Sequence, residues 1–130
     1  RVELLQEEQL VLVRTPGASD DEQASDYVYV DWGPLFAAQH GAGTPAFREP
    51  GLLVGLGPLG LSYILRAGGM GYFRKGSVSS HILAGELELV PGAPEFTYPA
   101  YAVYAEESED RPELHAALAG LKQTSAATGQ

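Results

Sequence analysis

Apolar residues along the chain gather in short blocks that alternate with polar or glycine-rich links. A continuous apolar run at residues 10–13 predicts a buried strand, and the strand-forming residues at 27–30 predict a second one. Pro34 suits the first turn of a short helix over residues 34–40, which Gly41 ends. The polar, acidic segment between the two strands predicts an exposed connector.

The same order of strand and helix then repeats with short links. The pattern predicts strands at 52–54, 70–73, 87–90 and 98–104, and helices at 58–67, 77–84 and 111–122. Ser77 is placed to cap the helix that it opens. Strands that alternate with helices over short links predict an α/β fold, with a mostly parallel sheet flanked by helices.

Composition and charge narrow the classes of function. The 130 residues suit one domain, and the absence of cysteine excludes disulfides, thiolate catalysis and cysteine-based metal sites. The net charge is −9, yet residues 32–85 contain four bases and one acid. Acidic flanks disfavour direct contact with nucleic acid. The less acidic middle is suited to an anionic small molecule, although acidic ends that only keep the domain soluble explain the same charge pattern.

Targeting and membrane signals are weak in this sequence. The longest apolar stretch, at 51–65, is interrupted by three glycines and Pro58, which predicts no membrane span. The chain opens with Arg1 rather than Met and shows no signal peptide, which suggests a fragment of a cytoplasmic protein.

An ordered series of short segments resembles a known family. The segments are Asp-Tyr-Val-Tyr-Val-Asp-Trp-Gly at 26–33, Val-Gly-Leu-Gly at 54–57, Ile-Leu-Arg-Ala-Gly-Gly-Met-Gly-Tyr-Phe at 64–73, Leu-Ala-Gly-Glu-Leu at 83–87 and the stretch from Val90 to Pro99. Together they resemble the C-terminal half of the effector-binding domain of LysR-type transcriptional regulators. The family usually has a proline after the third segment, and Arg74 stands there in this chain.

The resemblance implies a type II periplasmic-binding-protein-like fold, in which two α/β lobes hold a ligand in the cleft between them. Residues 25–93 would form the second lobe. Residues 1–24 and 94–122 would belong to an incomplete first lobe, with cross-over strands through 15–24 and 94–99, and 123–130 would be a flexible tail. The rest of the first lobe and the N-terminal helix-turn-helix that reads DNA would lie outside this sequence.

The candidate ligand site consists of the residues that directly follow two predicted strands, which we call strand exits. Trp32, Gly33 and Pro34 follow the strand at 27–30, and Gly57, Pro58 and Leu59 follow the strand at 52–54. Exposed amides where a helix begins can hold a carboxylate. In family terms both exits face the cleft, which implies an apolar or aromatic acid lying against Trp32 and Leu59. Tyr98 is a further candidate, and simple packing is the alternative for all three side chains.

Residues 55–60 also match G-x-G-x-x-G, with Arg74 and Lys75 about twenty residues further on. That pattern leaves a small NADP-dependent oxidoreductase as an alternative. The crossover helix would have only about seven residues, however, and half of the dinucleotide-binding sheet would be missing.

Catalytic chemistry has no visible set of residues. His40, His81 and His115 lie far apart in the sequence without a second metal ligand at helical spacing, and no nucleophile motif is present. We therefore expect no enzyme, metal or cofactor. The prediction is a ligand-sensing domain that forms a homodimer or tetramer and makes no contact with a membrane. It would control DNA binding by the N-terminal helix-turn-helix, which lies outside this sequence. A solute-binding protein of the same fold is the alternative.

Overall fold

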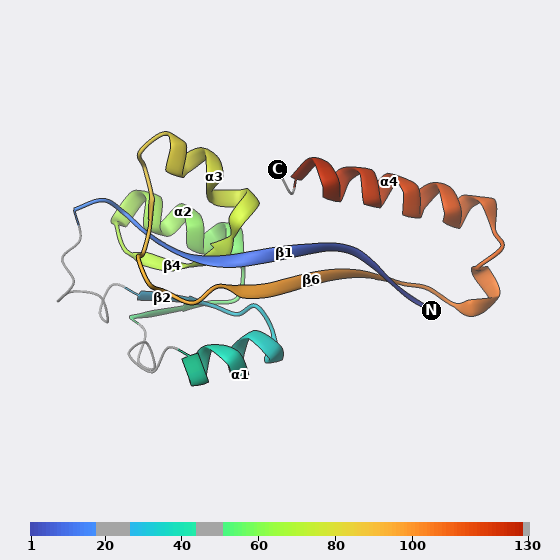
Figure 1. Cartoon of the computed structure of the whole chain (residues 1–130), viewed down its shortest axis with the longest axis horizontal. Coiled ribbons are helices and arrows are strands. Elements are labelled where there is room, and N and C mark those ends of the chain that lie inside the picture. Colours follow the sequence, from blue (N-terminus) through green and yellow to red (C-terminus); the bar gives the residue numbers. More distant parts are fainter. Residues whose placement is uncertain (18–26, 44–50, 129–130) are drawn as a thin grey trace.

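The computed structural model describes residues 1–17, 27–43 and 51–128, in which helices lie on both faces of a sheet (Figure 1). The strands are β1 (Val2–Arg14), β2 (Tyr27–Val30), β3 (Leu52–Val54), β4 (Met70–Arg74), β5 (Glu88–Leu89) and β6 (Phe96–Val103). The helices are α1 (Pro34–Gly43), α2 (Gly57–Ala67), α3 (Lys75–Leu83) and α4 (Pro112–Thr128), with a short 3-10 turn η3 (Glu106–Ser108) before α4.

The sheet has the order β3-β2-β4-β1-β5, and β6 also pairs with β1. β2 is parallel to β3 and β4, whereas β1 is antiparallel to β4, β5 and β6. The predicted α/β class with a sheet flanked by helices is confirmed, but the sheet is mixed rather than mostly parallel. The sequence between β1 and β2 shows no helical pattern of apolar residues, and a parallel pair of strands usually needs a crossover helix.

The two faces of the sheet bury alternate residues of the same strands. On the α1 side, Leu10 and Leu12 of β1 pack with Tyr72 of β4. On the α2 and α3 side, Val11 and Val13 pack with the side chains of those helices. Strict alternation along a strand sends successive side chains to opposite faces, so the continuous apolar run in β1 reflects a strand that is covered on both sides.

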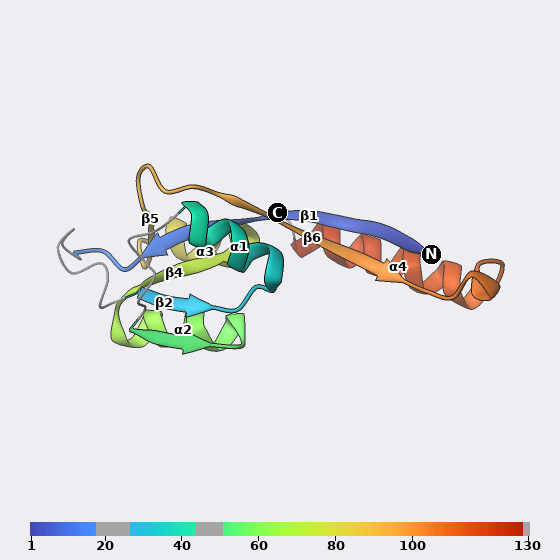
Figure 2. The ribbon, with the colours of Figure 1, turned by 90° about the horizontal axis from the view of Figure 1, so that it is seen from below.

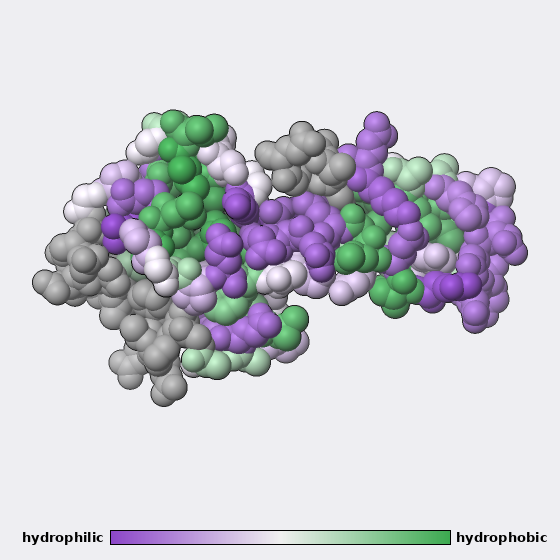
Figure 3. Space-filling view, viewed as in Figure 1, coloured by the Kyte–Doolittle hydropathy of each residue, from purple (hydrophilic) through white to green (hydrophobic). Residues whose placement is uncertain are grey.

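β1 has two halves with different surroundings. Residues 10–14 pair with β4, and Val13 and Arg14 also pair with β5 on the other side. We call these residues, together with β2 to β5 and helices α1 to α3, the sheet unit. Residues 2–8 pair only with β6, and we call this two-stranded extension the ribbon. Figure 2 shows the ribbon projecting from the sheet unit, with α4 along it. The end of α4 that joins η3 is covered by hydrophilic residues (Figure 3).

The division of the chain into two lobes stays a prediction. Residues 1–24 are predicted to belong to the first lobe, and residues 10–14 of this segment pair with β4 in the sheet that also contains β2. The predicted cross-over at 15–24 lies, beyond Gly17, outside the described residues. The predicted cross-over at 94–99 corresponds to the start of β6, whose Phe96 pairs with Leu10.

Three helix boundaries also differ from the prediction. α1 continues through Gly41 to Gly43 rather than ending at residue 40. α3 begins at Lys75, so Ser77 lies inside the helix and does not cap it. α4 continues to Thr128, so most of the predicted tail at 123–130 is helical. α1 and α2 begin within one residue of the predicted positions, each with a proline in its first turn.

Candidate functional site

Trp32 lies at the exit of β2, where the candidate site was predicted. Its indole Nε1 donates a hydrogen bond of 2.9 Å to the backbone oxygen of Tyr72, which fixes the ring against β4. The backbone turns directly after it, because Gly33 has a φ of +96° and donates its N–H to Asp31 Oδ1 at 2.9 Å. A positive φ of this kind favours glycine. These two hydrogen bonds hold the Trp32 indole against the end of the sheet.

The exit of β3 meets the same indole. α2 begins at Gly57, and a Cβ added there would lie 2.5 Å from Cη2 of Trp32. Gly60, one turn further on, faces Val30 and Phe73 at similarly close range. The two strand exits thus converge on one place, as predicted.

Two cavities flank Trp32 and share two of their lining residues, Trp32 and Arg74. The first has a volume of about 420 Å³ and lies where the sheet unit meets the ribbon and α4; its other lining residues are Gln6, Glu8, Tyr98, Pro99, Ala100, Tyr101 and Thr124. The second has a volume of about 250 Å³ and lies at the start of α2 and α3; its other lining residues are Gly57, Pro58, Leu61, Phe73 and Ser77. The second is the more apolar of the two.

The structure brings together part of the predicted set. Trp32 and Tyr98 meet edge to face in the first cavity, with ring centroids 5.2 Å apart, and Gly57 and Pro58 line the second. Three predicted residues line neither cavity. They are Gly33 and Pro34, which shape the turn into α1, and Leu59, whose side chain is 60% exposed.

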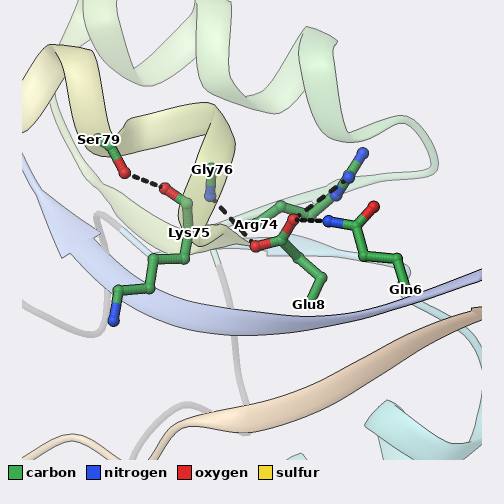
Figure 4. A network of polar contacts seen from close by, with 6 residues as sticks. All are labelled: Gln6, Glu8, Arg74, Lys75, Gly76 and Ser79. Atoms are coloured by element: carbon green, nitrogen blue, oxygen red, sulfur yellow. Dashed lines mark hydrogen bonds and ion pairs between the residues drawn. The ribbon is translucent and has the colours of Figure 1, made fainter. Parts of the chain in front are cut away.

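The prediction omitted the charged residues of the site, which Figure 4 shows. Glu8 of β1 is buried and accepts hydrogen bonds from Gln6 Nε2 at 3.0 Å, from the backbone N–H of Gly76 at 3.3 Å and from Arg74 Nη2 at 3.3 Å. The sequence singles out Arg74 as a departure from the family's proline and, in the dinucleotide-binding alternative, as part of a phosphate-binding pair, but not as part of this ligand site. Glu8 gave no signal, because an acid in a polar part of a strand looks exposed until its partners are known.

Two of the three glycines in the pattern at 55–60 serve packing, whereas a Cβ at Gly55 would meet nothing within 4 Å. Gly57 accommodates the indole and Gly60 accommodates two side chains of the sheet. Arg74 and Lys75, the expected phosphate pair, point in opposite directions from the start of α3 (Figure 4). The arrangement therefore lacks the close backbone approach that a pyrophosphate needs.

The histidines are dispersed in the structure as they are in the sequence. His40 is a buried residue of α1, and its Nε2 lies 2.8 Å from the Tyr27 hydroxyl. Burial lowers the pKa of His40 and raises those of Tyr27 and Tyr72, the last to about 12. Within residues 1–17, 27–43 and 51–128, no group of three or more potential ligands could hold a metal ion.

Among the same ranges, no helix combines the length and the hydrophobicity that crossing a membrane requires.

Comparison with solved structures identifies the class of fold. Comparison with protein-family models and with curated proteins gives no match. The bromide-bound regulatory domain of HypT from Salmonella typhimurium matches with a TM-score of 0.68 and 12% identity over 95% of this chain. The regulatory domain of CrgA, a LysR-type transcriptional regulator from Neisseria meningitidis, matches with a TM-score of 0.70 and 18% identity over 95% of this chain. Full-length LysG from Corynebacterium glutamicum, with bound effector Arg, matches with a TM-score of 0.63 and 18% identity over 99% of this chain.

The chain thus has the α/β fold that these solved structures use as the regulatory domain of transcriptional regulators. More narrowly, its fold is that of the LysR-type regulatory domain, as the sequence resemblance predicted. The chain spans 65% and 68% of the two isolated regulatory domains and 47% of full-length LysG.

Proposed function

We propose that this chain is the effector-sensing part of a LysR-type transcriptional regulator and that it binds a small anionic metabolite beside Trp32. The observation that carries the proposal is the convergence of the β2 and β3 exits on one indole, with a cavity on each side of it. A concave, largely apolar site with a few polar groups is the usual form of a small-molecule site.

The charge of the site supports an anion. Glu8 is buried, whereas the Arg74 side chain is 37% exposed and lines both cavities. Arginine suits carboxylates because its planar N–H groups can donate two parallel hydrogen bonds. A carboxylate-bearing molecule with an apolar body therefore fits the site best. Bromide in HypT and Arg in LysG are consistent with sites that accept an anion or a carboxylate in related folds.

The proposed mechanism is a shift between two arrangements of one protein. A ligand beside Trp32 would contact the sheet unit and the ribbon together, and it would favour the arrangement in which both sets of contacts are made. In the cytoplasm, a homodimer or tetramer would pass that preference to DNA-binding domains of the intact regulator.

Ligand binding can be tested by screening small metabolites for a rise in melting temperature and a change in Trp32 fluorescence. Trp32 is the single tryptophan of the chain, so its emission reports on this site. Ser77→Phe would fill the second cavity, and Ser80→Phe makes the same change at an exposed position of α3 outside both cavities. We expect at least one carboxylate to bind the wild type and Ser80→Phe, and to bind Ser77→Phe at least about tenfold more weakly. Equal binding by all three proteins, or no binding by any compound, contradicts the proposal.

The link to transcription needs a second measurement on the intact regulator. We expect the same compound to change the affinity of the regulator for its operator DNA. Binding that leaves DNA affinity unchanged would favour a solute-binding protein of the same fold.

A further inference from the structure

We infer that Arg74 selects the charge of the ligand: it binds a single carboxylate while Glu8 holds it in place, so the site prefers monoanions with an apolar body over neutral molecules and over dianions. The inference rests on the proposed function and specifies the class of ligand for the same site.

The position of Arg74 is the first step of the argument. Arg74 is the last residue of β4 and lines both cavities beside Trp32. A guanidinium group has five N–H donors, and only Nη2 makes a hydrogen bond in the described part of the chain, to Glu8. The remaining donors are available for a ligand in either cavity.

Glu8 lines the first cavity but is held in place by its own hydrogen bonds. Its side chain is 8% exposed, and three donors from β1, β4 and α3 surround its two carboxylate oxygens. A buried carboxylate is tolerated only when such donors compensate for its loss of water. Because all three bonds would have to break before Glu8 could leave, its role is to position Arg74 rather than to contact the ligand.

The pair sets the number of negative charges that the site can accept. Arg74 and Glu8 together carry no net charge, so one ligand carboxylate can bind Arg74, but a second negative charge would face Glu8 without compensation. Lys75 does not supply the missing positive charge, because its side chain points away from Glu8 and Arg74 (Figure 4).

The second cavity defines the rest of the ligand. Its lining is mainly apolar, with Pro58, Leu61 and Phe73 facing Trp32, and the Ser77 side chain is a polar exception. An acid bound at Arg74 can therefore bury an aromatic ring or a short alkyl chain there.

The test compares ligands of different charge: each acid has nearly the shape of its amide, and phthalate adds a second carboxylate to benzoate. Three monocarboxylates (benzoate, phenylacetate and hexanoate) are titrated against their amides and against phthalate, a dianion with the ring of benzoate, by Trp32 fluorescence and melting temperature. We expect at least one acid to bind at least about tenfold more tightly than its amide, and benzoate more tightly than phthalate. Arg74→Gln should remove the preference for the acid, whereas Arg66→Gln, the same change at an exposed position of α2 outside both cavities, should keep it.

Glu8→Gln tests whether the charge of Glu8 affects which ligand binds at Arg74, or whether Glu8 only stabilises the fold. The glutamine keeps the shape of the side chain but leaves Arg74 with an uncompensated positive charge. We expect the ratio of phthalate to benzoate affinity to rise at least about fivefold. An unchanged ratio contradicts the role of Glu8, even if the variant is less stable.

The outcomes distinguish the inference from the proposed function. If none of the three acids binds more tightly than its amide while other compounds bind beside Trp32, the inference is wrong and the proposed function stands. If no compound in either experiment binds, both are wrong.

Discussion

In β1, residues 10–14 pair with β4 inside the sheet unit, and the last two of them also pair with β5, whereas residues 2–8 pair with β6 alone. Leu12 and Val13 are at most 2% exposed, but Val2 and Leu4 are 65% and 47% exposed. The same strand is therefore a core element at one end and a surface element at the other. Secondary structure alone does not determine how much a residue stabilises the fold, because the layers packed on it set that amount.

The largest expected effect comes from shortening one leucine in each half of β1. Leu12→Ala should lower the free energy of unfolding by about 2–5 kcal/mol, because it leaves a cavity in a packed core. Leu4→Ala makes the same change eight residues away and should cost about 1 kcal/mol or less, because half of that side chain already faces solvent. Urea unfolding of both variants measures the difference. Equal losses would show that the ribbon is packed as tightly as the sheet unit.

A smaller effect is expected from filling the space beside Trp32. Gly57→Ala places a methyl group against the indole and should cost about 1–3 kcal/mol, with a shift in Trp32 emission. Gly55→Ala is the matched control, since a Cβ there meets nothing within 4 Å, and it should leave both stability and emission close to wild type. Emission that is the same in both variants would place the indole elsewhere.

Acid should weaken the sheet unit rather than the ribbon. Burial lowers the pKa of His40 below its usual 6.5, so the unfolded chain binds a proton more readily than the folded chain. Stability should therefore fall as the pH decreases from about 6.5 through the lower pKa of the folded state. His40→Gln should flatten this part of the pH profile, whereas His115→Gln, at an exposed position of α4, should not. Unfolding at a series of pH values tests both variants, and a slope that survives in His40→Gln would assign it to another group.

The smallest effect is expected where α4 meets the ribbon. Lys122 forms an ion pair with Glu3, and their side chains are 49% and 32% exposed. Lys122→Ala should cost about 0.2–1 kcal/mol and less at high salt, because exposed pairs are screened by ions. Lys75→Ala removes an exposed lysine without an ion pair among the described residues and should have no salt-dependent effect. A loss that does not depend on salt would point to packing of the lysine stem instead.

Much of the sheet unit could be predicted because its signals are local. Pro34 and the run at 10–13 each mark an element in the sequence, and both elements are present in the structure. The direction of β1 and its place between β4 and β5 could not be predicted in this way. They depend on pairing between residues about sixty positions apart, and a continuous apolar run is equally compatible with either direction.

In the candidate site, too, residues with a local sequence signal could be predicted, and residues that depend on distant partners could not. Trp32 and Gly57 were predicted from strand exits, a rule that follows from local order along the chain. The Glu8–Arg74 pair was missed, because its partners lie 66 residues apart and neither residue has a local motif. Leu59, predicted as a ligand contact, lines neither cavity, because the rotation of the helix turns it outward; Leu61 lines the second cavity instead.

The pairing of Leu10 with Phe96 has a consequence for how this protein can be rearranged. The chain enters the sheet unit at Leu10 and leaves it at Phe96, and these two residues face each other. Residues 11–95 therefore form a loop whose two ends lie side by side. We expect such a loop to be exchangeable as a unit between proteins that keep the same pair of flanking strands. The exchange would replace the whole lining of the second cavity, whereas Glu8 and Tyr98 of the first cavity would stay with the host strands.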